Sequence, residues 1–262
     1  MSSNSAVAGL LSGKRGIIIG VANQNSIAWA CAQSLAAAGM ELAFTYQGEV
    51  MRDRVAKTTA ELGEVPLYDL DVRSDEQIAK LFEDLKQRWD RLDFVLHSVA
   101  FAPKTAMANR FIDTTREDFL TAQDVSAYSL VAVCREAKPL MAPGGSIVTM
   151  TYYGSQKAVP GYNVMGVAKA GLEAAVRYLA VDLGADGIRI NAISAGAVNT
   201  LAARGVAHFR DLLKITAERA PLGRAIEVEE VGGATLFLAS DLSSGMTGET
   251  MYVDAGFNVT AG

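Results

Sequence analysis

A tyrosine and a lysine lie seven residues apart in the stretch Tyr162-Asn-Val-Met-Gly-Val-Ala-Lys169. In an α-helix this spacing is about two turns and roughly 10.5 Å of rise, so both side chains would lie on one face. A cationic amine near a phenol stabilises phenolate character, which suits a proton donor to a developing oxyanion. Beside a nicotinamide, the pair would perform oxidoreductase chemistry. The alternative for an isolated pair is an aromatic anchor next to a solvated charge.

The elements that must position this pair alternate along the chain between strand-like and helix-like patterns. We expect strands at 16–21, 41–46, 65–70, 93–99, 146–151, 188–194 and 250–253. We expect helices at about 26–38, 50–62, 75–89, 116–141, 162–184 and 227–239, and we leave open a break within 116–141. This alternation predicts an α/β fold of the Rossmann-like, doubly wound kind, with a seven-stranded parallel sheet flanked by helices on both faces. No repeat or linker interrupts the pattern, so residues 1–262 are predicted to form one domain.

Composition narrows the class of protein. The chain has 262 residues, of which 50% are hydrophobic, and its formal net charge is −5. This charge argues against a general nucleic-acid binder, which needs a basic surface. His97 and His208 are the only histidines and no spaced carboxylates accompany them, so we expect no metal site. Residues 1–13 predict neither a signal sequence nor membrane insertion, and Cys31 and Cys134 are predicted to be core thiols of a cytoplasmic protein.

Small and polar residues follow the predicted strands, where a sheet of this kind binds its ligands. After the first strand, Gly20 and the segment to Ser26-Ile27 open a helix, which would let backbone amides approach a pyrophosphate; an ordinary turn is the alternative. Ser26 is the predicted N-cap. Gln47 ends the second strand. It has neither the negative charge that would bind the free ribose hydroxyls of NADH nor the positive charge that would suit the 2′-phosphate of NADPH. The neighbouring Glu49 favours NADH over NADPH.

Two further strand ends have open interpretations. Asp71-Val72 would hold the adenine edge of a dinucleotide, or Asp71 would instead cap the helix that begins near Ser74. His97-Ser98-Val99 ends the fourth strand, and its small residues, Ser98 and Val99, would face the cofactor ribose and nicotinamide. His97 is interpreted as a packing residue.

Taken in order, these motifs resemble the short-chain dehydrogenase/reductase superfamily and, within it, the bacterial NADH-dependent enoyl-acyl-carrier-protein reductases. The resemblance extends from Gly20 to the closing stretch Met251-Tyr-Val-Asp254-Ala-Gly-Phe-Asn258. It implies reduction of the trans-2 double bond of an enoyl thioester, the last step of the fatty acid elongation cycle. It also implies that Tyr162 stabilises an enolate oxygen, that Lys169 holds the nicotinamide ribose and that Tyr152 lines the acyl pocket.

The same resemblance assigns the remaining site residues. Those implied to contact NADH are Gly20, Ser26, Ile27, Gln47, Asp71, Val72, Ser98, Val99, Lys169, Val198, Asn199, Thr200, Leu201 and Ala202. Those implied to contact the substrate are Ala102, Tyr152 and Tyr162. The family habit is a homotetramer.

An alternative pair, Tyr153 and Lys157, has the Tyr-x-x-x-Lys spacing of carbonyl-reducing members of the superfamily, such as 3-ketoacyl thioester reductases. That spacing works only on a helix, and Gly154, Pro160 and Gly161 disfavour one here. A third hypothesis is a dinucleotide-binding regulatory protein without turnover, against which the set of Tyr152, Tyr162 and Lys169 argues.

The segment at about 200–220 is predicted to be a substrate-binding lid. From Thr200 to Arg224 it carries a local charge of +3, contributed by Arg204, Arg210, Lys214, Arg219 and Arg224 against Asp211 and Glu218. We expect these basic residues to meet the acidic acyl carrier protein that delivers the substrate. A solvated helical face is the alternative for any single arginine.

Overall fold

The computed structural model of the chain describes residues 7–198, 200 and 209–260. The strands are β1 (Arg15–Ile19), β2 (Glu41–Tyr46), β3 (Leu67–Asp69), β4 (Leu92–His97), β5 (Met141–Thr151), β6 (Arg189–Ala195) and β7 (Thr250–Val253). The helices are α1 (Ile27–Ala37), α2 (Gly48–Thr59), α3 (Asp75–Arg88), α4 (Lys104–Ala108), α5 (Arg116–Gln123), α6 (Ser129–Ala137), α7 (Asn163–Gly184), α8 (Phe209–Arg219) and α9 (Val228–Ala239).

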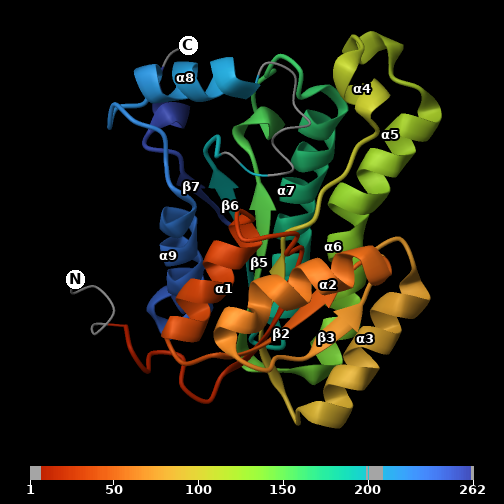
Figure 1. Cartoon of the computed structure of the whole chain (residues 1–262), viewed down its shortest axis with the longest axis vertical. Helices are drawn as coiled ribbons and strands as arrows, with labels where there is room; N and C mark the ends of the chain where they lie inside the picture. Colours follow the sequence, from red (N-terminus) through yellow and green to blue (C-terminus); the bar gives the residue numbers. More distant parts are fainter. Residues whose placement is uncertain (1–6, 199, 201–208, 261–262) are drawn as a thin grey trace.

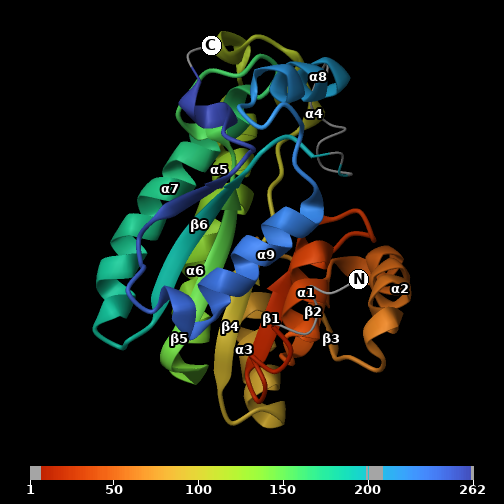
Figure 2. The ribbon, with the colours of Figure 1, turned by 90° about the vertical axis from the view of Figure 1, so that its left-hand side faces the viewer.

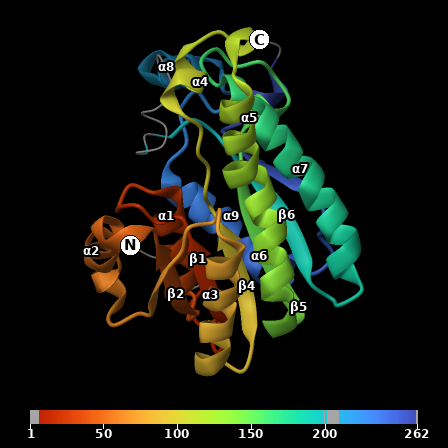
Figure 3. The same cartoon turned by 90° about the vertical axis from the view of Figure 1, so that its right-hand side faces the viewer.

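The seven strands form one parallel sheet in the order β3-β2-β1-β4-β5-β6-β7 (Figure 1). This arrangement confirms the predicted Rossmann-like α/β fold. The strand order reverses between β1 and β4, and a parallel sheet of this kind binds ligands beyond the carboxyl ends of its strands at such a point. Figures 1 and 3 show α4 and α8 together at one end of the molecule.

Helices cover both faces of the sheet because both faces of its strands are apolar. In β1, Ile18 belongs to the core shared with α1 and α9, whereas Ile17 and Ile19 belong to the core shared with α3, α6 and α7. Figure 2 shows α1 and α9 on the first face, and Figure 3 shows α3, α6 and α7 on the second. The successive side chains of a strand alternate between faces, so a continuous run of isoleucines fills both layers.

The helical region predicted over 116–141 is broken in its interior, which the sequence left open, and the prediction of its end was wrong. A π-helical turn, Asp124–Tyr128, separates α5 from α6, and β5 already begins at Met141. Pro139 lies in the short 3-10 turn Lys138–Leu140 that ends the helical region. The short helix α4 was not predicted.

None of the helices in the described part of the chain is long and apolar enough to cross a membrane.

Candidate active site

Two tyrosines that are ten residues apart in the sequence meet at the carboxyl end of β5. Tyr152 follows the last residue of β5, and Tyr162 is the residue immediately before α7. Their ring centroids are 4.9 Å apart, and the rings meet edge to face at 72°. Such a pair holds both phenols in a defined geometry.

Two glycines make this contact sterically possible. A Cβ atom on Gly154 would lie 2.5 Å from Cδ1 of Tyr162 and 3.2 Å from Cδ1 of Tyr152. A Cβ atom on Gly166 would lie 2.7 Å from the carbonyl oxygen of Gly154. The absence of both side chains lets the 3-10 turn Tyr153–Ser155 lie directly against the first turn of α7.

Asn163 fixes the start of α7. Its φ angle of 40° lies in the left-handed region, which asparagine tolerates better than most residues. Its Nδ2 group donates hydrogen bonds to the carbonyl oxygens of Asn109, at 2.7 Å, and Met107, at 3.2 Å. These bonds join the residue after Tyr162 to the α4 region.

Lys169 is buried, and its Nζ donates a 2.7 Å hydrogen bond to the carbonyl oxygen of Met150 in β5. Burial lowers the pKa of the Lys169 ammonium to about 8, while the nearby Glu173 carboxylate acts in the opposite direction. The Lys169 amine is therefore protonated at neutral pH, but it loses its proton as the pH rises through about 8.

The tyrosine hydroxyls respond to the same environment in the opposite sense. Burial raises the pKa of Tyr152 to about 12. Burial raises the pKa of Tyr162 further, and Tyr152 and Glu173 add to that increase. The expectation that the amine gives Tyr162 phenolate character was thus wrong for this structure, because desolvation of the phenolate dominates. Both phenols are neutral hydrogen-bond donors.

His97 ends β4 and is fully buried beneath this site. Its Nδ1 pairs with Oγ1 of Thr149 at 2.9 Å and its Nε2 with Oγ of Ser129 at 2.8 Å. Burial, followed by the Lys169 charge, lowers the pKa of His97 to about 3, so the ring is neutral. This agrees with the interpretation of His97 as a packing residue.

Gly20 lies where β1 and β4 approach each other at the switch point. Its φ angle is 116°, and a Cβ atom there would lie 2.1 Å from the carbonyl oxygen of Ser98. Only glycine fits this position, and it lets the residue after β1 pack directly against the backbone of Ser98 after β4.

Ser26 is the N-cap of α1, as predicted, but its side chain does not bond to the helix. Its Oγ accepts hydrogen bonds from the backbone N–H groups of Ala22, at 3.1 Å, and Asn23, at 3.0 Å. The hydroxyl therefore organises the loop after β1 instead of covering the helix end. The first backbone N–H groups of α1 consequently point beyond the helix without a side-chain cap, an arrangement that favours anions.

Gln47 and Asp71 lie next to each other at the carboxyl ends of β2 and β3. Arg73 first, and the Gln47 side chain to a smaller extent, hold the pKa of Asp71 at about 2 by hydrogen bonding. Asp71 does not cap α3, because Ser74 does so by accepting a 3.2 Å bond from the N–H of Gln77. The capping alternative for Asp71 was therefore wrong, and the adenine-edge role stays a prediction.

The other predicted residues fall into three groups. Ala102 and Tyr162 pack against one small apolar cluster that includes Met107 and Met165. Val72 and Val99 border the core on the α3 face, and Val198 and Thr200 are buried. Asn199, Leu201 and Ala202 lie outside the described residues.

The alternative pair, Tyr153 and Lys157, lacks the helical geometry that it would need. Tyr153 begins the three-residue 3-10 turn and packs its ring against Phe257, with centroids 5.8 Å apart. Lys157 is exposed. This part of the sequence analysis is confirmed in that no α-helix joins the two residues.

One basic residue of the segment predicted to meet a carrier protein, Arg224, is bonded to an acidic side chain of α9. Arg224 forms a two-point ion pair with Glu230, at 2.7 and 2.8 Å, next to the capping box that begins α9. The prediction that Arg224 meets a carrier protein stays a prediction, since its side chain remains about half exposed in this ion pair. Within the described parts of the chain, no three metal-ligating side chains come together.

Sequence reasoning missed Glu173, a buried carboxylate one helical turn beyond Lys169. It accepts hydrogen bonds from Thr151 and Ser155, which lie on either side of Tyr152. A lone acidic residue in the apolar stretch from Gly171 to Val176 was the available signal.

Comparisons with known proteins agree with this geometry. The family model described as "Enoyl-(Acyl carrier protein) reductase" matches residues 20–258. The chain is 51% identical over 250 residues to "Enoyl-[acyl-carrier-protein] reductase [NADH] 1" of Rhizobium meliloti, with 95% of this chain and 92% of that protein covered.

Solved structures give the same result. The Bacillus cereus enoyl-acyl carrier protein reductase with NADP+ and an indole naphthyridinone has a TM-score of 0.94 and 49% identity, covering 96% of this chain and 99% of that one. The reductase of Anaplasma phagocytophilum in complex with NAD has a TM-score of 0.93 and 45% identity, covering 97% and 95%.

Proposed function

The chain belongs to the enoyl-(acyl carrier protein) reductase family, and from this premise we propose that it reduces the trans-2 double bond of an enoyl thioester with NADH, through Tyr152, Tyr162 and Lys169. The reaction is that of an oxidoreductase acting on a CH–CH bond in fatty acid elongation. The observation that carries the assignment of residues is the edge-to-face contact of Tyr152 with Tyr162 beside the buried Lys169 ammonium.

The residues at the switch point fit a dinucleotide. Gly20 adds no side chain at the switch point, the start of α1 presents backbone N–H groups, and Gln47 with Asp71 offers polar groups for the adenosine end. Val198 and Thr200, which follow β6 in the chain, would line the cofactor, and the same role is proposed for Asn199, Leu201 and Ala202. When bound, NADH would supply a hydride to the β-carbon of the substrate, and a proton from water would reach the α-carbon to complete the reduction.

Tyr162 acts on the oxygen of the thioester. As hydride addition pushes electrons toward that oxygen, the Tyr162 hydroxyl donates a hydrogen bond to the enolate that forms. Because the pKa of Tyr162 is raised by burial, the proton stays on the phenol, and the hydrogen bond acts in a medium of low polarity where it is stronger than in water.

Lys169 contributes its charge and its donors. An ammonium has three N–H donors, and the bond to Met150 uses one of them, so the group can also hold ribose hydroxyls of the cofactor. Its positive potential stabilises the negative charge that develops nearby. Tyr152 and Ala102 would line the acyl chain.

The wider context of the enzyme is also a proposal. The substrate would arrive on an acidic acyl carrier protein, and a lid at about 200–220 would close over it; α8 is the described part of that segment. A single domain over residues 1–262, a homotetramer and a cytoplasmic location complete the proposal.

The test compares two substrates and two tyrosines. The rate of NADH oxidation is measured with a trans-2-enoyl thioester and with the matching 3-ketoacyl thioester, each repeated with NADPH. We expect oxidation only with the enoyl substrate, with loss of activity in Tyr162→Phe but not in the matched variant Tyr153→Phe. Oxidation only with the ketoacyl substrate would overturn the assignment in favour of a carbonyl reductase.

A further inference from the structure

Glu173 is a buried carboxylate in the centre of the site, with 7% of its surface exposed. Its Oε1 accepts a 2.7 Å hydrogen bond from Oγ1 of Thr151 and a 2.6 Å bond from Oγ of Ser155. Hydroxyl donors at such short distances are typical of bonds to an ionised carboxylate. Thr151 ends β5 and Ser155 ends the 3-10 turn, so the two bonds hold the chain on both sides of Tyr152.

The carboxylate joins this segment to the helix that carries Lys169. Glu173 lies four residues after Lys169 on α7, and residues four apart are neighbours on a helix surface. Neither side chain has an ion-pair partner within the described residues, and the ammonium is turned toward Met150. The two opposite charges therefore act on each other through a buried region without direct contact.

A few other charged or titratable groups face this pair. Arg177 of α7 donates a 3.0 Å hydrogen bond to the backbone carbonyl oxygen of Glu173. Burial first, and the Glu173 charge to a smaller extent, raise the pKa of Tyr162 at the start of α7 and of Tyr252 in β7. His97 of β4 faces Lys169 and is neutral. Glu173 is therefore the nearby negative charge that opposes the loss of the Lys169 proton through burial.

A buried carboxylate is costly to a fold, and its two hydroxyl partners would satisfy a neutral amide almost as well. The placement of this charge between the tyrosine segment and the lysine helix indicates a task beyond packing. We propose that Glu173 is a positioning residue for the reduction, whose carboxylate holds the Tyr152 segment against α7 and keeps the Lys169 amine protonated. This inference rests on the proposed roles of Tyr152 and Lys169.

The decisive variant is Glu173→Gln, which keeps the size of the side chain and a carbonyl acceptor but removes the charge. The pH profile of kcat/KM with NADH and a trans-2-enoyl thioester is measured from pH 6 to 10 in the full-length protein. We expect the loss of activity on the alkaline side to move to lower pH by about one unit, because removing a nearby opposite charge lowers the pKa of Lys169. An unmoved alkaline limb would overturn the proposal.

Two variants separate charge from positioning. Ser155→Ala keeps the carboxylate but removes one bond to the Tyr152 segment, so we expect kcat to fall by roughly threefold to tenfold with the alkaline limb unmoved. Asp182→Asn removes a charge from the exposed far end of α7 and should change neither quantity. A shift of the limb in Asp182→Asn as large as in Glu173→Gln would attribute the effect to general electrostatics and contradict the proposal.

Glu173→Asp covers the case in which the amide variant does not fold. This variant retains the charge and shortens the side chain, so we expect a lower kcat with the alkaline limb within about 0.3 units of the wild-type position. A limb displaced by a full unit would overturn the charge role.

NADH binding, measured by energy transfer from the protein to the bound cofactor, gives a readout without turnover. As the pH is raised, we expect the affinity for NADH to begin to fall at a lower pH in Glu173→Gln than in the wild type. Wild-type protein that binds NADH but never turns over an enoyl thioester would reject the proposed function itself, whereas normal wild-type turnover with an unmoved limb in Glu173→Gln would reject only the role of Glu173.

Discussion

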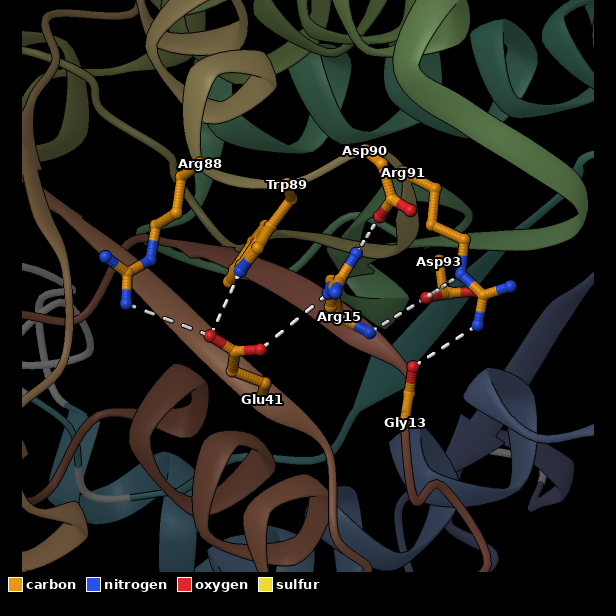
Figure 4. Close-up of polar contacts among 8 residues, drawn as sticks. All are labelled: Gly13, Arg15, Glu41, Arg88, Trp89, Asp90, Arg91 and Asp93. Atoms are coloured by element: carbon orange, nitrogen blue, oxygen red, sulfur yellow. Dashed lines mark hydrogen bonds and ion pairs between the residues drawn. The ribbon is translucent and has the colours of Figure 1, made fainter.

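At the amino end of the sheet, Arg15 begins β1 and Glu41 begins β2, while at the carboxyl end Lys169 and Glu173 lie behind β5. The amino end holds many charges in direct contact. Arg15 contacts Glu41 at 3.7 Å and also Asp90, and Arg88 contacts Glu41 at 3.8 Å (Figure 4). The indole N–H of Trp89 donates a 3.0 Å bond to the same Glu41 carboxylate.

Most of this network is open to water, although the Asp93 carboxylate within it is buried. Half of the Glu41 side chain is exposed, and most of the Asp90 side chain is. Arg91 lies 3.5 Å from Asp93 and also donates to the carbonyl of Gly13 at 3.3 Å (Figure 4). Exposed pairs of this kind contribute little to stability, because solvent screens them and the side chains lose entropy.

The carboxyl end has the opposite arrangement. It holds two charged groups that are almost fully buried and that are not paired directly with each other or with another charge in the described structure. Desolvation therefore moves the pKa of Lys169 toward neutral pH. The comparison teaches that burial without direct pairing, and not the number of charges, marks the chemical end of this sheet.

The largest effect should come from Tyr162→Phe. Removing the hydroxyl takes away the donor to the developing enolate while the ring and its contact with Tyr152 remain. We expect kcat to fall by about 10²–10³-fold, as when one oxyanion donor is removed, with little change in NADH affinity. Steady-state rates and a fluorescence titration measure both quantities, and retention of more than half the wild-type kcat would remove Tyr162 from the mechanism.

The next effect concerns the charge of Lys169. Its pKa in the folded protein is about 8 and lies below the ordinary lysine value, so the ammonium is present below pH 8 and is lost as pH rises through that value. We expect wild-type kcat/KM to decline through about pH 8 and Lys169→Met to lose roughly 10²-fold at pH 7 with a flat alkaline limb. A limb that persists in Lys169→Met would belong to another group.

A smaller effect tests the contact between the turn and the helix. In Gly154→Ala the new Cβ would lie 2.5 Å from the Tyr162 ring, which must therefore move. We expect kcat to fall by roughly tenfold while the protein stays folded, since displacement of a reacting group by a fraction of an ångström is costly. Gly233→Ala in α9 is the matched control, because nothing lies within 4 Å of its new Cβ, and it should leave kcat unchanged.

The fold was predictable because strands buried on both faces appear in the sequence as continuous apolar runs, as in Ile17, Ile18 and Ile19. A break in the helical region 116–141 could be left open from the sequence, but its place and its π-helical form could not be predicted. They depend on tertiary contacts: there Ser126 bonds to Phe101 and Ser129 bonds to His97. Periodicity reports which face of a helix is apolar but not these partners.

Part of the candidate site was predictable in the same way. The spacing of Tyr152, Tyr162 and Lys169 identified residues that the fold gathers behind β5, and a resemblance supplied their roles. Glu173 was missed although it is the lone acidic residue of an apolar stretch, because a carboxylate on a helix normally indicates a solvated face. The side-chain direction of Ser26 was missed because a serine before a helix normally indicates a cap. The sign of the Tyr162 pKa shift depended on burial, which residue spacing does not specify.

The smallest effect should follow from breaking the exposed network at the amino end. Glu41→Gln removes the acceptor shared by Arg15, Arg88 and Trp89, yet it leaves a side-chain oxygen for the indole N–H. We expect the melting temperature to change by less than about 3 °C and kcat to stay the same, because screened surface pairs contribute little. Thermal unfolding at low and at high salt measures this, and salt should reduce even the small difference. A large loss of stability or of activity would mean that the amino-end charges act over the length of the sheet, and the contrast between its two ends would then fail.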